Sequence, residues 1–294
     1  MMMVMFCSTA LAWADQPTAT TQPAAAPPSK WQYTLFDPTP SDQLRGMDTD
    51  RPNVTNTPHT IDAGHLQIET GVIDYTLYQN HTPGTNLRSD DFVFGEFNFR
   101  LGVLNNLEVN AVVNAYEMDR TRDHLAGVTT YASGYSDTSV GAKLNLWGNE
   151  GGDAVWTSAL AIQPQFKLPT AQDGLGNGHF EFIVLFPFLV NLPQGFHLGV
   201  QPAVSYERNS TDSGYVTGLQ NSISVDRVML GNLDVYLEYA SDVTTEQHVK
   251  AAQTIDVGGI YQLTNNIALD SGVNFGLNDQ TPNLEVLAGI SVRF

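Results

Sequence analysis

The chain has 294 residues, and its 31 acidic against 13 basic side chains give a formal net charge of −18. This acidic balance repels phosphate backbones, so we expect no nucleic acid among the partners. Charged residues make up only 15% of the chain, below the roughly one quarter that is usual in soluble globular proteins, and this composition indicates strands and polar loops.

Residues 1–14 read as a signal peptide, because an apolar run is followed by Ala12-Trp13-Ala14, a small-x-small pattern at which signal peptidase cuts. The run lacks basic residues, so a different start or a hydrophobic N-terminus of another kind stays open as an alternative. The only cysteine, Cys7, lies inside it. The exported chain would therefore contain neither disulfides nor thiolate metal sites.

Residues 15–34 are rich in Pro, Ala and Thr and predict a disordered linker. Residues 35–64 carry many Pro and Asp residues without a regular period and predict an irregular segment. From His65 to the end, stretches of about nine to twelve residues alternate apolar and polar side chains, which is the length of a tilted membrane-spanning strand. Twelve strands are predicted, at residues 65–78, 92–103, 106–116, 137–147, 155–168, 179–191, 196–207, 215–226, 232–240, 253–263, 266–277 and 284–294.

The connections between these strands alternate between short and long, which is typical of an outer-membrane β-barrel. No stretch is long and apolar enough for a membrane helix. We therefore predict a closed antiparallel transmembrane barrel over residues 65–294, located in the outer membrane of a Gram-negative bacterium. The alternative is a secreted soluble β-sandwich, since alternation alone does not reveal whether the apolar face meets lipid or a second sheet.

The last stretch, residues 284–294, alternates throughout and ends on Phe294. An unpaired strand in hydrocarbon would leave costly backbone groups unsatisfied, so we expect it to pair with the first strand. Phe294 resembles the terminal aromatic residue that outer-membrane proteins present to the barrel-assembly machinery. We also expect aromatic rims, with Trp147 and Trp156 at the short-turn end and Tyr206 and Tyr215 at the other.

Two motifs carry a family resemblance: Thr49-Asp50-Arg51-Pro52, and Ala63-Gly64-His65. With later strand motifs they make the chain similar, from Leu35 to Phe294, to the outer-membrane barrel family associated with the MetA pathway of phenol degradation. The resemblance implies a twelve-stranded barrel and passage of small molecules. It supplies no catalytic residues.

The inward phase of the predicted strands carries more acidic than basic side chains, so the lumen should favour cations or neutral polar solutes over anions. The alternative is that these charges only pair across strands. The predicted lumen-lining residues are Glu96, Arg100, Glu108, Lys143, Lys167, Asp234, Glu238, Asp256, Asp270, Glu285 and Arg293.

One predicted strand places Ile183, Leu185 and Leu189 on the inward phase, which gives the lumen an apolar wall. This wall is either a path for hydrophobic solutes or, as we favour, a surface against which residues 35–60 pack as a plug. Asp50, Arg51 and Pro52 would then make contacts inside the barrel. Their alternative role is an ordinary surface turn.

Catalytic chemistry is not indicated, because no G-x-S-x-G elbow occurs. His197 reads as a hydrogen-bonded lumen residue, and His59 and His65 are too irregularly placed to predict a metal site. We expect neither a metal nor another cofactor. Two hypotheses remain: a channel for small molecules, including hydrophobic or aromatic ones, and a non-conducting structural or adhesive barrel in contact with lipid and lipopolysaccharide.

Overall fold

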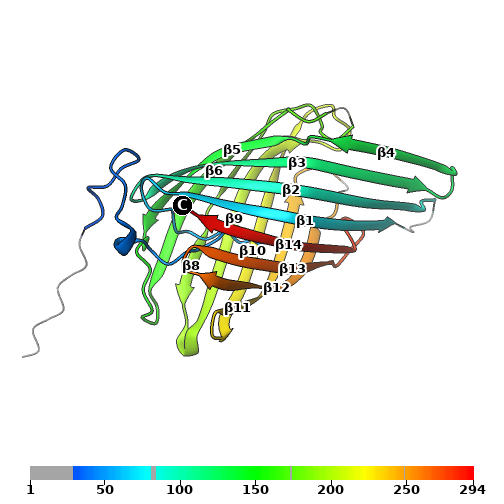
Figure 1. Ribbon diagram of the computed structural model, residues 1–294. Coiled ribbons are helices and arrows are strands. Elements are labelled where there is room, and N and C mark those ends of the chain that lie inside the picture. Colours follow the sequence, from blue (N-terminus) through cyan, green and yellow to red (C-terminus); the bar gives the residue numbers. More distant parts are fainter. Residues whose placement is uncertain (1–28, 81–83, 173, 248) are drawn as a thin grey trace, which may run out of the picture.

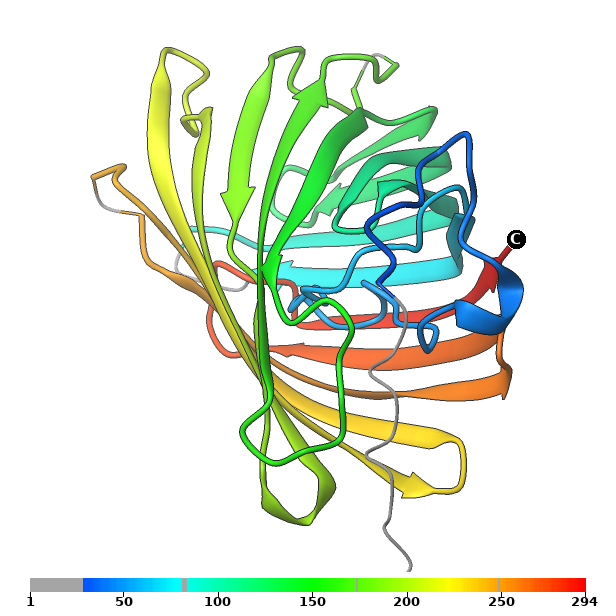
Figure 2. The ribbon, with the colours of Figure 1, turned by 90° about the vertical axis from the view of Figure 1, so that its left-hand side faces the viewer.

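The computed structural model describes residues 29–80, 84–172, 174–247 and 249–294. The predicted signal peptide and residues 15–28 of the predicted linker lie outside the described residues. The described chain folds into a closed antiparallel β-barrel, with an N-terminal segment at one mouth and inside it (Figures 1 and 2).

Fourteen strands and two short 3₁₀ turns make up the described chain. They are η1 (Ser41–Gln43), β1 (Leu66–Asn80), β2 (Leu87–Leu104), β3 (Leu107–Asp123), β4 (Val128–Gly134), β5 (Thr138–Trp147), β6 (Ser158–Leu168), β7 (Glu181–Leu185), β8 (Phe188–Asn191), η2 (Pro193–Gly195), β9 (Phe196–Arg208), β10 (Tyr215–Leu230), β11 (Leu233–Thr244), β12 (Ala252–Thr264), β13 (Ile267–Gly276) and β14 (Leu284–Arg293).

The strands form twelve positions around the wall, as predicted. β4 pairs only with the C-terminal half of β3, beyond the part of β3 that pairs with β5. β7 and β8 are two halves of one strand, and both pair with β6 and β9. The first and last strands close the sheet, with Ile68 opposite Val292 and Leu77 opposite Leu284. The short connections lie at one end, called the short-turn end, and the long ones at the other, called the long-loop end (Figure 1).

Several strand boundaries differ from the prediction by a few residues, and two differences change the strand pattern. Residues 117–136 were expected to be a loop, but β3 continues to Asp123 and β4 returns beside it as a hairpin. Both faces of this hairpin are polar, as at Asp119, Arg120, Thr121 and Arg122, so the alternation that marks the other strands is missing. The strand expected at 179–191 is broken at Phe186-Pro187, where proline removes a ladder donor.

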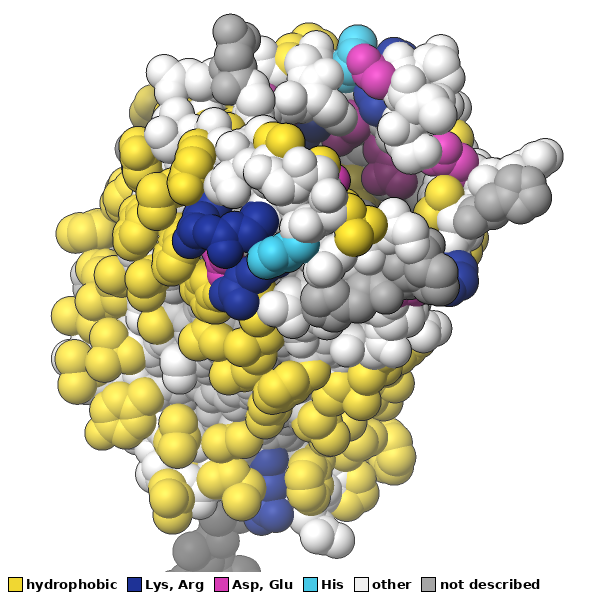
Figure 3. Space-filling model, turned by 90° about the vertical axis from the view of Figure 1, so that its right-hand side faces the viewer, with side chains coloured by type: hydrophobic (Ala, Val, Ile, Leu, Met, Phe, Trp, Pro, Cys, Tyr) yellow, Lys and Arg dark blue, Asp and Glu magenta, His cyan; other side chains and the backbone are white. Residues whose placement is uncertain are grey.

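The distribution of side chains is inverted relative to a soluble protein. The largest fully buried side chains are mostly polar or charged, among them Arg100, Lys143, Glu69 and Glu108. The outward side chains are apolar, and Figure 3 shows hydrophobic groups covering the flanks of the barrel. A soluble sandwich needs an apolar core, so that alternative is wrong. Within the described residues, no helix is long and apolar enough to cross a membrane.

Candidate functional site

The barrel interior contains residues 48–60, called here the inner segment. Figure 2, which faces the short-turn end, shows this part of the chain running inside the ring of strands. Its polar groups bond to inward side chains of strands on opposite sides of the barrel, including Glu69 on β1, Lys143 on β5 and Glu238 on β11. The inner segment is therefore held from several directions by the wall.

Asp50 joins a fully enclosed cluster of charges. Its carboxylate accepts hydrogen bonds from Lys143 Nζ at 2.7 and 2.9 Å and lies 3.5 Å from Arg100 Nε. Arg100 is also bonded to Glu69 at 2.8 Å and to Glu108 at 2.9 Å. The side chains of Arg100, Lys143, Glu69 and Glu108 are all fully buried. Buried charges of this kind are tolerated because each is paired and hydrogen-bonded.

Arg51, the next residue, forms ion pairs with a different group of side chains. Its guanidinium lies 2.9 Å from Glu96, 3.4 Å from Asp74 and 3.5 Å from Asp270. Burial alone would lower the pKa of Arg51, but the three carboxylates outweigh it and raise the pKa above its ordinary value. Arg51 is therefore a permanent counter-charge for three acidic side chains of the wall.

The middle of the inner segment reaches the strands on the other side. Glu238 accepts hydrogen bonds from the backbone N–H groups of Val54 at 2.7 Å and Thr55 at 2.8 Å. The hydroxyl of Thr55 also lies 2.7 Å from the Ser222 hydroxyl. These bonds satisfy irregular backbone that would be costly to bury without partners.

Asn56 extends the inner segment to the wall formed by β6 and β9. Its side-chain amide donates to Gln163 at 3.1 Å, and its backbone N–H donates to the Gln201 side chain at 3.0 Å. Gln163 lies opposite Leu185 in the sheet, so the tip of the segment is beside the predicted apolar wall.

Both ends of the inner segment are anchored at the short-turn end. Ile61 N–H donates to Glu108 at 2.8 Å, and the Thr60 N–H donates to Asn149 at 2.9 Å. Before the segment, Lys30 and Arg45 form ion pairs with Glu150, at 3.1 and 3.2 Å. The anchoring begins at Lys30, inside the range predicted as linker.

Two cavities lie on either side of the inner segment. A cavity of about 690 Å³ opens at the short-turn end and is lined by His59, Ser158, Leu189, His197 and Gly199, among others. A smaller one, of about 130 Å³, lies toward the long loops and is lined by Lys167, Ile183 and Ser205, among others. Along β6 and β9, Gln163 and Gln201 fall between these two sets and are the residues that bind Asn56.

The remaining predicted lumen residues are distributed along the interior. Lys167 is paired with Glu181 at 2.8 Å and Asp137 at 3.3 Å near the long loops. Arg293 donates to the backbone oxygen of Arg45 at 2.8 Å at the short-turn end. Asp256 is fully buried and accepts from Thr254, and Glu285 accepts from Asn274. Asp234 lines the larger cavity.

The predicted apolar residues share the inner face. Ile183 lies opposite Ser205, Leu185 opposite Ala203 and Leu189 opposite Gly199, and these partners on β9 are on the buried face of the wall. Pro52 is buried within the inner segment. Phe294 is 67% exposed, while its backbone N–H donates to Leu66 O at 2.8 Å.

Several residues of the interior were not among the predicted site residues. They include the glutamines Gln67, Gln163 and Gln201, whose inward phase could have revealed them, and the carboxylate Asp74. A second group combines Asp48 and His59 of the inner segment with His197 and Asp226 of the wall. The spacing of these four residues in the sequence offers no signal that they line one cavity.

A closed antiparallel barrel with a polar interior and an apolar exterior defines the outer-membrane type of β-barrel. The crystal structure of an outer membrane channel from Pseudomonas putida F1 superposes with a TM-score of 0.58 at 12% identity, covering 78% of this chain and 95% of that one. The transport unit of the autotransporter AIDA-I from Escherichia coli gives a TM-score of 0.49 at 11% identity, over 78% of this chain and 90% of that one.

Residues 49–294 match the protein family described as "Putative MetA-pathway of phenol degradation", and the chain belongs to this family. The resemblance read from the motifs is thereby confirmed. No curated protein matches the sequence of the chain.

Proposed function

We propose that this protein is an outer-membrane channel for passive passage of small molecules, and that the inner segment closes it as a plug. The observation that carries this proposal is the position of the segment between two cavities that open toward opposite ends. Displacing residues 48–60 would join the cavities into one path. A plug held by polar bonds, with little apolar packing, suits reversible displacement because water can replace its partners.

The proposed location is the outer membrane of a Gram-negative bacterium. The outward face offers apolar side chains to lipid, including Leu237, Val257 and Leu269. Exposed Trp147 and Trp156 at the short-turn end, and the stacked rings of Tyr206 and Tyr215 at the other, suit the two interfaces. Lipid and lipopolysaccharide would be the surrounding partners, and the exposed Phe294 would present the last strand to the barrel-assembly machinery.

The proposed solutes are small and include hydrophobic or aromatic molecules. Leu189 faces the larger cavity and Ile183 the smaller, with Leu185 between them on the same inner face. This line of apolar side chains would let a neutral aromatic molecule move along one wall of the lumen without contacting the charged side chains. The family description, which names phenol degradation, is consistent with that class of solute.

A second candidate is a non-conducting barrel with a structural role. The observation that favours it is the number of charged contacts that hold the segment, since Asp50, Arg51 and Thr55 are each bonded to charged side chains of different strands. A segment held this firmly could serve mainly to stabilise the barrel.

Single-channel conductance in a planar bilayer separates the two candidates. The full chain is compared with a version lacking residues 15–60. We expect rare openings of the full chain and steady conductance of the truncated one. Silence of both, with folding verified by heat-modifiable mobility on gels, would overturn the channel and support the structural barrel. Steady, equal conductance of both would overturn the plug.

A further inference from the structure

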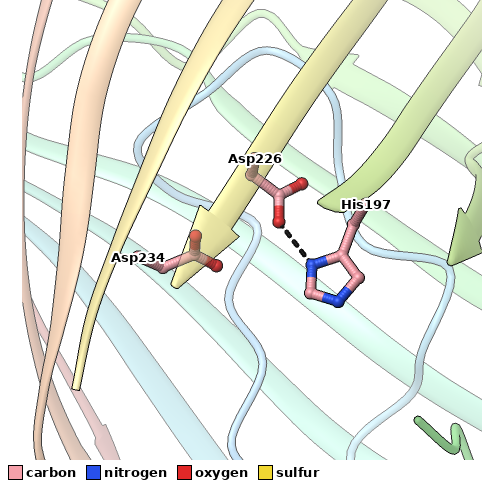
Figure 4. A group of neighbouring side chains, drawn as sticks. All are labelled: His197, Asp226 and Asp234. Atoms are coloured by element: carbon pink, nitrogen blue, oxygen red, sulfur yellow. Dashed lines mark hydrogen bonds and ion pairs between the residues drawn. The ribbon is translucent and has the colours of Figure 1, made fainter. Parts of the chain in front are cut away.

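Three side chains with titratable groups lie close together at the short-turn ends of three adjacent strands. His197 is on β9, Asp226 on β10 and Asp234 on β11, and Figure 4 shows them converging on the barrel interior. The sheet register produces this meeting, because Asp226 lies directly opposite His197 while Asp234 is opposite Val228, two residues along from Asp226. Side chains two residues apart point to the same face of a strand.

The geometry of the group suits a bound ion. His197 Nδ1 lies 2.7 Å from Asp226 Oδ1, and one donor atom from each of the three residues lies within 4.8 Å of the others. All three side chains are half-buried and line the larger cavity, from which an ion could enter. Among the described residues, this is the one group of three or more such side chains that close together.

One carboxylate oxygen of the group has no partner in the protein. Asp234 Oδ1 is buried and has no hydrogen-bond partner. No described Lys or Arg forms an ion pair with Asp226 or Asp234, whereas the carboxylates around Asp50 and Arg51 have such partners. A buried, unpartnered carboxylate oxygen is costly unless something else satisfies it. A cation between the two carboxylates would do so.

The inner segment adds charge of the same sign to the cavity. Asp48 lines the same cavity and is near enough to His197 and Asp234 to act on both electrostatically. Burial would raise the pKa of Asp48, but the hydrogen bonds from His59 and Thr57 outweigh burial and hold the pKa at about 2. Asp48 therefore remains ionised and increases the attraction for a cation.

We propose that His197, Asp226 and Asp234 form a binding site for a divalent transition metal ion of the zinc type. One imidazole nitrogen with carboxylate oxygens is a donor set that zinc accepts, while calcium and magnesium prefer oxygen donors alone. The site lines the larger cavity, and ion binding there does not depend on the channel being open.

Zinc binding to the full chain in detergent micelles tests the proposal by isothermal titration calorimetry near neutral pH. We expect one Zn²⁺ per chain, and at least about tenfold weaker binding in both His197→Gln and Asp234→Asn, as loss of direct ligands requires. The matched control is His179→Gln. His179 forms a pair with Asp212 at 3.0 Å near the long loops, without a third ligand, so its loss should leave the affinity unchanged.

Co²⁺ gives a second readout, because its visible absorption reports nitrogen and oxygen ligation directly. The band should appear with wild type and with His179→Gln, and disappear in His197→Gln. Absence of zinc binding by the wild type would overturn the proposal. Undiminished binding in both ligand variants, with folding verified by heat-modifiable mobility, would place the ion elsewhere and would also overturn it.

Discussion

The ammonium group of Lys143 and the carboxylate of Asp50 are joined by two hydrogen bonds, of 2.7 and 2.9 Å, across 93 positions of sequence. Arg51, adjacent to Asp50, is paired instead with Glu96. Two neighbouring residues of opposite charge are thus matched to wall regions of opposite charge. The inner segment fits the lumen in one orientation because a reversed or shifted segment would place like charges together.

Replacement of Asp50 should release the inner segment. In Asp50→Asn, Lys143 stays buried with only Glu108, at 3.6 Å, as a charged partner. Breaking a buried pair in this way costs about 3–5 kcal/mol, so bilayer recordings should show openings at least tenfold more often than wild type. Asp42→Asn is the control, since Asp42 is an exposed acidic residue of the same N-terminal region. An unchanged opening frequency in Asp50→Asn would contradict the anchoring role.

Removal of the inner segment should make the pore prefer cations. Without Arg51, the carboxylates of Asp74, Glu96 and Asp270 face the lumen without that counter-charge. The reversal potential of the version lacking residues 15–60, measured in a KCl gradient, should indicate K⁺ over Cl⁻, and Asp270→Asn should reduce the preference. Glu246→Gln, on a long loop, is the control. Anion preference would contradict the assignment of these carboxylates to the pore lining.

A cross-link between the inner segment and the wall should hold the channel shut. The hydroxyls of Thr55 and Ser222 lie 2.7 Å apart, so the double variant Thr55→Cys with Ser222→Cys should form a disulfide. Cys7 is the one native cysteine and falls in the predicted signal peptide. Openings should be lost on oxidation and return on reduction. Each single variant is the control, and openings that persist in the oxidised double variant would contradict displacement of the segment.

Acid should loosen the anchor at the short-turn end. Burial would raise the pKa of Glu150, but Arg45, Lys30 and Asn105 together hold it below its ordinary value. The stabilisation is therefore complete above the ordinary pKa of about 4.3, and it is lost as the pH falls through the lower, folded-state value. Hydrogen exchange of residues 30–45 should be slower in wild type than in Glu150→Gln at pH 7, and the two should converge in acid. Equal exchange at pH 7 would contradict the anchor.

The apolar wall should affect neutral aromatic solutes more than ions. Leu189→Asn and Ile183→Asn place a polar amide where each cavity now has an aliphatic side chain. In liposomes carrying the version that lacks residues 15–60, we expect phenol flux to fall several-fold while KCl conductance stays unchanged. Leu237→Asn, on the outer face, tests whether the effect is specific to the interior. Equal loss of both fluxes would indicate a damaged barrel, and no loss of phenol flux would contradict the apolar path.

The closed barrel and its inner face could be predicted because they follow from a local rule. Alternate residues of a strand point to opposite faces, so Glu108 and Lys143 could be assigned to the same side from the sequence. Closure follows from the cost of an unpaired edge in lipid. The β3–β4 hairpin escaped this reasoning because both of its faces are polar, and the break at Phe186-Pro187 lies inside an otherwise apolar run.

The partners of the inner segment could not be predicted, since nothing local links Asp50 to a lysine 93 positions away. The same holds for His197 and Asp226. Their contact depends on the register between β9 and β10, which the loop between these strands sets and the alternation leaves undetermined.

The pairing of β1 with β14, called here the seam, determines how the inner segment could enter and leave the barrel. The segment leads directly into β1, and β1 is bonded to β14 along its length, up to the pairing of Leu66 with Phe294. Once that seam forms, the segment is inserted into a closed ring from the short-turn mouth and cannot leave sideways. Its exits are the two mouths, and its C-terminal end stays tethered to the wall. Under the proposed plug function, the tethered segment would withdraw through the short-turn mouth, and its attachment to β1 would return the same segment to its own pore.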